Sequence, residues 1–183
     1  RKRFERRVNY GDTICWRVDL GRIPSAAACA LQECVVDARK ANLIPDVLLL
    51  CEHPHVITLG RNGKQENLRA SNHLLEQMNV EFHATNRGGD ITYHGPGQIV
   101  GYPILDLSLR GKDLHEHLRK IEDALIRACA RFGVAAGRRE GLTGVWVENR
   151  KLASIGVGVR KWISMHGFAI NITRESLPPF FAI

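Results

Sequence analysis

The chain is organised around a glycine-rich segment that reads Arg87-Gly88-Gly89-Asp90-Ile91-Thr92-Tyr93-His94-Gly95-Pro96-Gly97-Gln98. Five glycines and one proline lie between Gly88 and Gly101, and an apolar run follows. Glycine reaches backbone angles that other residues avoid and lets a ligand lie against bare amides. The segment therefore predicts a cradle for a polar or acyl group. The alternative is a long surface turn, which has no need of an Arg, a Tyr and a His among its glycines.

Length and charge limit the classes of protein that fit. At 183 residues and 44% hydrophobic content, the chain is expected to be one globular domain rather than a disordered segment. Lys and Arg exceed Asp and Glu by 26 to 19, a net charge of +7. An excess of this kind favours an acidic partner, which could be nucleic acid, an anionic membrane or an acidic protein. Charge alone does not choose among them.

The cysteines show neither a zinc motif nor a disulfide framework. They are odd in number and no two have CxxC spacing, so reduced thiols in the cytoplasm are expected. No stretch has the length of a membrane helix. The basic start from Arg1 to Arg7 predicts a solvated terminus rather than a nucleic-acid arm. The five cysteines are Cys15, Cys29, Cys34, Cys51 and Cys129.

Hydrophobic periodicity predicts alternating strands and helices. Amphipathic helices are expected after Pro24-Ser25 through Lys40, from Ser71 to Met78, and from Leu114 to Phe132, where Gly133 ends the last one. Strands are expected over residues 14–20, 47–51, 56–59, 80–84, 99–107, 145–148, 151–159 and 166–172, with a hairpin turn at Asn149-Arg150. The glycine-rich segment is then a loop between two strands. These elements predict a single mixed α/β (α+β) domain, a β-sheet core with flanking helices.

Two sets of residues could carry chemistry. Lys151 precedes the small residues Ser154-Ile155-Gly156, where a ligand could lie, and a lysine drawn toward an apolar site has a lowered pKa. The alternative for Lys151 is an ordinary charged hairpin residue. His53 and His55 could bind a metal, but Pro54 extends the link between them and no acidic or thiolate partner has the usual spacing, so no metal site is expected.

Several segments together resemble the lipoate-protein octanoyltransferases, also called lipoyl(octanoyl) transferases. The glycine-rich segment, continued to Tyr102-Pro103, resembles the signature of that family. The other similar segments are Glu52-His53-Pro54, Thr58-Leu59-Gly60-Arg61, Gly144-Val145-Trp146-Val147, Lys151-Leu152-Ala153-Ser154-Ile155-Gly156 and His166-Gly167-Phe168-Ala169-Ile170-Asn171. They span nearly the whole chain, so the resemblance is to a complete catalytic domain over residues 1–183.

The resemblance implies a fold related to biotin protein ligases and lipoate ligases. It implies transfer of an octanoyl group from octanoyl-acyl carrier protein to a lysine of a lipoyl domain, the first step of endogenous protein lipoylation. The acceptors implied are the lipoyl domains of 2-oxoacid dehydrogenases and the glycine cleavage H protein. The family needs no cofactor and no metal, and works in the cytoplasm without nucleic acid or membrane.

The resemblance also assigns residues. Lys151 matches the lysine that lowers the pKa of a nucleophilic cysteine and acts as acid and base. The substrate-binding residues implied are Arg87, Gly88, Gly89, Asp90, Ile91, Thr92, Tyr93, His94, Ser154, Ile155, Gly156, Gly167, Phe168 and Ala169. A thiolate is the competent nucleophile, a nearby ammonium favours it, and loop amides could hold the oxyanion.

The nucleophile itself departs from the family pattern. In the family it sits in a Pro-Cys-Gly turn shortly after a Pro-Phe pair, which Pro179-Phe180 matches here. None of the five cysteines occupies that position, so the nucleophile is expected just beyond Ile183 and the C-terminus of the domain is expected to be incomplete. A chain ending at Ile183 should bind substrate without forming the acyl-enzyme.

Two other classes stay open on the sequence. A lipoate or biotin ligase would share the fold and bind ATP, but such ligases carry an Arg followed by three glycines, unlike Arg87-Gly88-Gly89-Asp90. A nucleic-acid-binding module is suggested by the charge alone and would bind in a salt-sensitive way. The sequence contains no recognition motif for nucleic acid.

Overall fold

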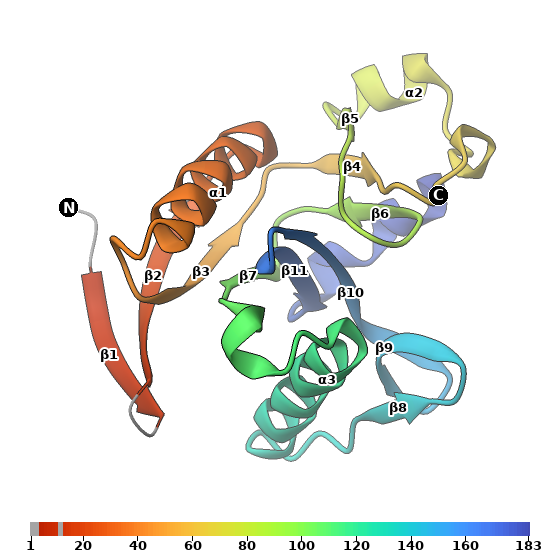
Figure 1. Cartoon of the computed structure of the whole chain (residues 1–183). Coiled ribbons are helices and arrows are strands. Elements are labelled where there is room, and N and C mark those ends of the chain that lie inside the picture. Colours follow the sequence, from red (N-terminus) through yellow and green to blue (C-terminus); the bar gives the residue numbers. More distant parts are fainter. Residues whose placement is uncertain (1–3, 11–12) are drawn as a thin grey trace.

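The computed structural model describes residues 4–10 and 13–183, which form two β-sheets flanked by helices (Figure 1). The larger sheet has the strand order β1-β2-β3-β7-β11-β10-β9-β8, and the smaller sheet has the order β5-β4-β6. Only the β2/β3 pair of the larger sheet and the β4/β5 pair of the smaller one are parallel. The predicted mixed α/β fold with a sheet core is confirmed.

The larger sheet contains β1 (Phe4–Tyr10), β2 (Thr13–Arg22), β3 (Asp46–Glu52), β7 (Gln98–Ile104), β8 (Gly137–Arg139), β9 (Leu142–Val147), β10 (Arg150–Arg160) and β11 (Ile163–Asn171). The smaller sheet contains β4 (Val56–Leu59), β5 (Glu81–Ala84) and β6 (Ile91–His94). The helices are α1 (Ser25–Lys40), α2 (Asn72–Gln77) and α3 (Leu114–Ala130). Short 3₁₀ helices cover Gln65–Asn67, Leu107–Arg110, Arg174–Ser176 and Pro178–Ala182.

Helices α1 and α3 cover opposite faces of the larger sheet. On β11, Ala169 packs in the core cluster that contains Ala28 and Val36 of α1, whereas its neighbour Ile170 packs in the cluster that contains Ile121 of α3. Successive residues of a strand point to opposite faces, so the two clusters lie on the two sides of the sheet. A third cluster lies under the smaller sheet and includes Ile57 and Tyr93.

Local chemistry explains where the two long helices begin and end. The Asp113 carboxylate accepts a hydrogen bond from the Glu116 amide at 3.0 Å and caps the start of α3. Gly133 has φ +73°, a conformation that glycine adopts at little cost, and it follows the end of that helix as predicted. Pro24 precedes α1, whose buried Ala28, Gln32, Val36 and Arg39 recur at helical spacing.

The sequence predictions were wrong or incomplete in three places. Phe4 begins strand β1, so only residues 1–3 of the expected solvated terminus lie outside the described residues. The second part of the glycine-rich segment is not a loop, because Ile91–His94 form β6 and pair antiparallel with β4. Strand β8 was not predicted, since its sequence Gly-Arg-Arg has no apolar alternation.

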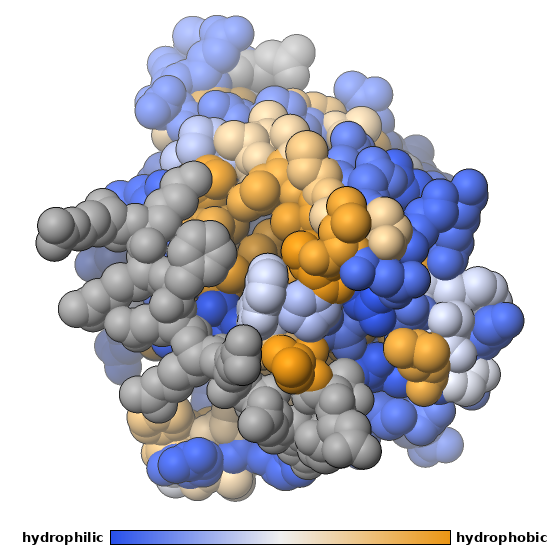
Figure 2. Space-filling model, turned by 60° about the vertical axis from the view of Figure 1, so that its left-hand side comes forward, coloured by the Kyte–Doolittle hydropathy of each residue, from blue (hydrophilic) through white to orange (hydrophobic). Residues whose placement is uncertain are grey.

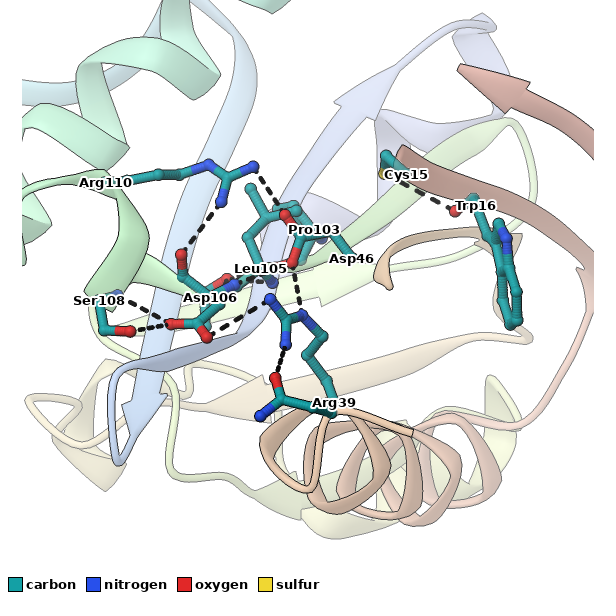
Figure 3. Close-up of polar contacts among 11 residues, drawn as sticks. Cys15, Trp16, Arg39, Asp46, Pro103, Leu105, Asp106, Ser108 and Arg110 are labelled. Carbon is teal, nitrogen blue, oxygen red and sulfur yellow. Dashed lines mark hydrogen bonds and ion pairs between the residues drawn. The ribbon is translucent and has the colours of Figure 1, made fainter. Parts of the chain in front are cut away.

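A buried ion cluster joins α1 to the strands beneath it (Figure 3). The Asp46 carboxylate is only 1% exposed. Its Oδ1 lies 2.8 Å from Arg39 Nε, its Oδ2 lies 2.7 Å from Arg110 Nη2, and Oδ1 also accepts a hydrogen bond from the Asp106 amide at 3.0 Å. The cluster therefore fixes the last turn of α1 against the first residue of β3 and the segment after β7.

Apolar side chains reach the surface on the side of the molecule that carries the N-terminal hairpin. Figure 2 shows them gathered next to the residues drawn in grey and bordered by polar side chains. Half-buried residues of β2 and α1 pack at the edge of the first core cluster, among them Trp16, Val18, Leu31 and Val35. Among the described residues, no helix combines the length and the hydropathy needed to span a membrane.

Substitution of Asp46 tests the buried cluster. Asp46→Asn removes the charge that two arginines share, so it should lower the free energy of unfolding by about 3 kcal/mol, as expected when one partner of a buried pair is removed. Glu148→Gln is the control, because Glu148 and Arg150 form an exposed pair at 3.3 Å and such pairs contribute under about 1 kcal/mol. Urea unfolding at pH 7 measures the free energy of unfolding of both variants. Equal losses of stability in Asp46→Asn and Glu148→Gln would contradict the stabilising role of the buried cluster.

Candidate active site

A cavity of about 170 Å³ lies where the glycine-rich segment meets strands β10 and β11. The smaller sheet contributes Thr58 from β4 and residues of β6, the loop before β6 contributes Arg87, Gly89 and Asp90, and the larger sheet contributes residues of β7, β10 and β11. Helix α1 closes it with Ser25 and Cys29, which are four residues apart and share one helix face. The cavity is thus built from both sheets.

The glycine loop approaches β10 without an intervening side chain. The Gly88 amide donates a hydrogen bond to the Val157 carbonyl at 2.8 Å. A Cβ on Gly156 would lie 2.6 Å from the Gly88 carbonyl oxygen, closer than real Cβ atoms come to backbone. Gly89 has φ +86°, which favours glycine. On its other side, the loop accepts backbone hydrogen bonds from Gly60, Arg61 and Asn62 at 3.0 to 3.2 Å.

Arg87 is a buried cation at this loop. Its Nη2 donates to the Thr58 carbonyl at 2.6 Å, its Nε donates to Thr58 Oγ1 at 3.2 Å, and its Nη1 donates to the Gly88 carbonyl at 3.1 Å. Among the side chains that the structure describes, no carboxylate forms an ion pair with it. Burial lowers the pKa of Arg87 to about 10, and nearby Asp90 opposes that shift. The guanidinium therefore brings to the cavity wall a positive charge that is held by neutral oxygens, with Asp90 as a nearby carboxylate that it does not contact directly.

His94 is held as a neutral imidazole with a known tautomer. Gln98 donates its amide hydrogens to the Tyr93 carbonyl at 3.2 Å and to Asn171 Oδ1 at 2.9 Å, so Gln98 Oε1 must be the acceptor at 2.7 Å from His94 Nδ1. His94 Nδ1 then carries the proton, and Nε2 faces Thr58 Oγ1 at 3.4 Å as an acceptor. Burial is the main cause that lowers the pKa of His94 to about 3.

His166 links the glycine loop to the opposite hairpin. Its backbone has φ +56°, a strained value for a residue with a side chain. Its amide donates to Gln32 Oε1 at 2.8 Å, and its Nε2 forms a short hydrogen bond with Asn86 Oδ1. Burial, with the charges of Arg87 and Arg61, lowers the pKa of His166 to about 4. The strain is thus maintained by partners on α1 and on the loop.

The two histidines of the Glu52-His53-Pro54-His55 turn bind protein groups. His53 Nδ1 donates to the Ile23 carbonyl at 2.6 Å, and Tyr102 donates its hydroxyl to His53 Nε2 at 2.6 Å. Burial lowers the pKa of His53 and raises that of the Tyr102 phenol. His55 Nδ1 lies 2.6 Å from the Tyr93 hydroxyl. The His53 ring therefore orients Tyr102, which lines the cavity.

Lys151 lies at the edge of the cavity on β10. Its Nζ is 5.1 Å from the centre of the Trp146 ring, within the range of a cation–π contact. The pairing of β9 with β10 shifts register between Lys151 and Ala153, and such bulges redirect side chains. Lys151 is exposed as a whole residue, and partial burial of its amine lowers the pKa of Lys151.

Comparison with known proteins identifies the family. The family model described as "Lipoyl protein ligase A/B catalytic domain" matches residues 24–178. A protein of Geobacter metallireducens called octanoyltransferase is 51% identical over 165 residues, 90% of this chain and 74% of that protein. One of Syntrophotalea carbinolica with the same name is 56% identical over 154 residues, 84% of this chain and 70% of that protein. The chain belongs to the octanoyltransferase family. It is therefore an acyltransferase.

Solved structures confirm the fold of this octanoyltransferase family member. P. falciparum LipL1 in complex with lipoate superposes with a TM-score of 0.69 at 15% identity and covers 90% of this chain and 50% of that one. A biotin acetyl coenzyme A carboxylase synthetase from Helicobacter pylori, solved with biotinylated ATP, has a TM-score of 0.51 at 11% identity, covering 86% and 61%. The predicted relation to lipoate ligases and biotin ligases holds for the fold.

The structure gathers nearly all predicted site residues of this octanoyltransferase family member around one cavity. Lys151 lines it, as do Arg87, Gly89, Asp90, Ile91, Thr92, His94, Ser154, Ile155, Gly156, Gly167, Phe168 and Ala169. Gly88 and Tyr93 lie outside the lining. Gly88 faces Val157, and the fully buried Tyr93 packs edge-to-face on Phe180 with ring centres 5.4 Å apart. Their backbones hold the loop and β6 in place.

Sequence reasoning missed the side chains that line the cavity outside those stretches. They are Ser25, Cys29, Thr58, Thr85, Val100, Tyr102 and His166. Thr58, Val100, Tyr102 and His166 fall in segments that resemble the family, so that resemblance could have indicated them. Ser25, Cys29 and Thr85 carried no signal, because a serine or threonine at the end of an element and a buried cysteine occur in many folds.

The contact between Gly88 and Gly156 can be tested with one methyl group. Gly156→Ala places a Cβ against the Gly88 carbonyl and should lower the free energy of unfolding by about 1–3 kcal/mol, the range of overpacking. Hydrogen exchange at the Gly88 amide should accelerate as its bond to Val157 opens. Gly137→Ala is the control, since nothing lies within 4 Å of its Cβ position. Equal exchange at Gly88 in both variants would refute the close approach.

Proposed function

We propose that this acyltransferase moves an octanoyl group from octanoyl-acyl carrier protein to a lysine of a lipoyl domain, in the first step of protein lipoylation. Support comes from relatives called octanoyltransferase that are 51% identical in sequence to this chain. The observation that carries the proposal is a cavity lined both by apolar side chains, Val100, Phe168 and Ala169, and by two cations, Arg87 and Lys151. Such a cavity suits an alkyl chain with a reactive carbonyl at one end.

The donor and acceptor follow from the chemistry of acyl transfer and from the family resemblance. Acyl carrier protein and lipoyl domains are expected to be acidic partners, and the net charge of +7 would attract both. The acceptors proposed are the lipoyl domains of 2-oxoacid dehydrogenases and the glycine cleavage H protein. A cytoplasmic location belongs to the same proposal, together with a reaction that needs no cofactor, metal, nucleic acid or membrane.

The reaction proposed has two balanced steps. A cysteine thiolate attacks the octanoyl thioester, and the carrier-protein thiol leaves with a proton from the Lys151 ammonium. The amine of the acceptor lysine then attacks the new thioester, gives its proton to Lys151, and the cysteine leaves as thiolate. A lowered lysine pKa supports this exchange, because a catalytic acid and base works best with a pKa near the working pH. The Arg87 charge would stabilise each oxyanion.

The cysteine proposed for this thioester lies beyond Ile183, in the Pro-Cys-Gly turn of the family. Cys29 is the internal cysteine that lines the cavity, but burial, aided by Glu33, raises the pKa of its thiol, which opposes thiolate formation. Cys51 is less suited still, since burial raises its pKa to about 12.

Mass spectrometry with peptide mapping tests the thioester. In a protein that continues past Ile183, incubation with octanoyl-acyl carrier protein should add one octanoyl group to the cysteine after Pro179-Phe180, and Cys→Ser there should abolish it. Cys29→Ser should leave the octanoyl group on the same cysteine, the one after Pro179-Phe180. An octanoyl group found on Cys29 at a competent rate would overturn the placement of the nucleophile. Activity that requires ATP and free octanoate would instead indicate a ligase.

Substitution of Lys151 tests its role as acid and base. Lys151→Ala should reduce octanoyl transfer by at least about 100-fold, the contribution of general acid–base catalysis. Lys151→Arg should rescue little, because a guanidinium does not release its proton. Arg150→Ala is the control for charge, since Arg150 is the exposed neighbour of Lys151. Transfer to a lipoyl domain and thermal unfolding should be measured together, and near-normal turnover in Lys151→Ala would reject the role.

A further inference from the structure

The stem of Lys151 packs against the backbone of Gly144. A Cβ on Gly144 would lie 2.7 Å from Lys151 Cε and 2.7 Å from the Ala153 carbonyl oxygen. Gly144 has φ +137°, outside the usual range of residues with side chains. Trp146 contacts the same lysine from the neighbouring position of β9. The direction of Lys151 therefore depends on where the Gly144 backbone lies.

A buried carboxylate fixes that backbone. Glu122 of α3 is 0% exposed, and its Oε1 accepts a hydrogen bond from the Gly144 amide at 3.0 Å. Its Oε2 accepts from Arg119 Nη1 at 2.7 Å and from Arg138 Nε at 2.8 Å. Burial alone would raise the pKa of Glu122, but these three hydrogen bonds together lower it, so the carboxylate stays ionised.

Packing of α3 on the sheet does not require this carboxylate. Ile121, Leu125 and Cys129 already bury the apolar face of the helix in the second core cluster. A charge buried among them is costly unless it is fully hydrogen-bonded, and two exposed arginines would find acceptors at the surface without it. Only the Gly144 amide needs a hydrogen-bond acceptor at the position of the Glu122 carboxylate.

We propose that Glu122 is a positioning residue for Lys151. Its carboxylate holds the Gly144 amide, Gly144 sets the stem of Lys151 at the edge of the cavity, and the lysine amine is thereby kept at the reacting acyl group. The inference rests on the proposed role of Lys151 and adds a residue that touches no substrate. A displacement of about 1 Å at a catalytic group can reduce the rate by up to about 100-fold.

The isosteric variant Glu122→Gln separates this role from simple anchoring of the helix. A glutamine has one acceptor oxygen, which the two guanidiniums attract more strongly, so its NH₂ group would face the Gly144 amide, donor against donor. We expect kcat to fall about tenfold while KM for the donor changes less than about twofold. The apparent pKa that Lys151 contributes to the pH–rate profile should also shift.

Two control variants share the helix or the cluster. Arg138→Gln removes one donor from Glu122 Oε2 and leaves the Gly144 contact intact. It should therefore lose about as much stability as Glu122→Gln but less kcat. Glu116→Gln breaks an exposed pair with Lys120 at 2.8 Å on the same helix and should leave activity unchanged. If Glu122→Gln fails to fold, Glu122→Asp serves instead, because it keeps the negative charge for the arginines while its side chain is one methylene shorter and loses reach toward the Gly144 amide.

A double-mutant cycle decides the proposal. In the Lys151→Ala background, Glu122→Gln should cause no further loss of transfer, because its effect passes through the lysine. An additional tenfold loss there, or equal kcat losses in Glu122→Gln and Arg138→Gln at equal stability, would overturn the inference. Normal activity of Lys151→Ala would reject the proposed catalytic role of the lysine. Normal activity of Glu122→Gln together with impaired activity of Lys151→Ala would reject only the positioning role of Glu122.

Discussion

The cavity depends on the approach of two backbones at Gly88 and Gly156. The hydrogen bond from the Gly88 amide to Val157 holds the glycine loop against β10, and a single Cβ at Gly156 would separate them. Other parts of the site follow from this contact. With the loop in place, Arg87 is directed toward Thr58, and Asn86 comes within reach of His166. Glycine is therefore required at these positions because the two backbone segments lie so close together, more than because the backbone has to be flexible.

Electrostatics in the site are simple because burial leaves few charges. His94 and His166 are neutral near pH 7, since burial lowers the pKa of each well below its ordinary value. Arg87 keeps its charge with hydrogen bonds to neutral oxygens, and Lys151 adds a second cation with a lowered pKa. A site that offers positive charge and few competing anions favours reactions in which an oxyanion or a thiolate forms.

The sequence predicted the elements whose pattern is local. The two long helices, the hairpin that carries Lys151 and the glycine-rich cradle could be named because periodicity and glycine content are visible in short windows. Most of the lining from Arg87 to Ala169 was named from the family resemblance. The smaller sheet was not predicted, since the pairing of β6 with β4 depends on contacts between residues that are 32 to 38 apart, as in Leu59–Ile91 and Val56–His94. Tyr93 and Glu122 show the same limit. Which way Tyr93 points, and which amide Glu122 accepts, are properties of the assembled sheets.

Several hydrogen bonds of the site join residues that are far apart in the chain. Arg87 and Thr58 are 29 residues apart, and Asn86 and His166 are 80 apart. During synthesis, at about 5–20 residues per second, the glycine loop leaves the ribosome about 4 to 17 seconds before the end of the hairpin that will cover it. Until then the loop has no β10 to bond. The cavity therefore cannot form while only the N-terminal half of the chain has been synthesised. A nascent chain can complete it only after β11 has left the ribosome.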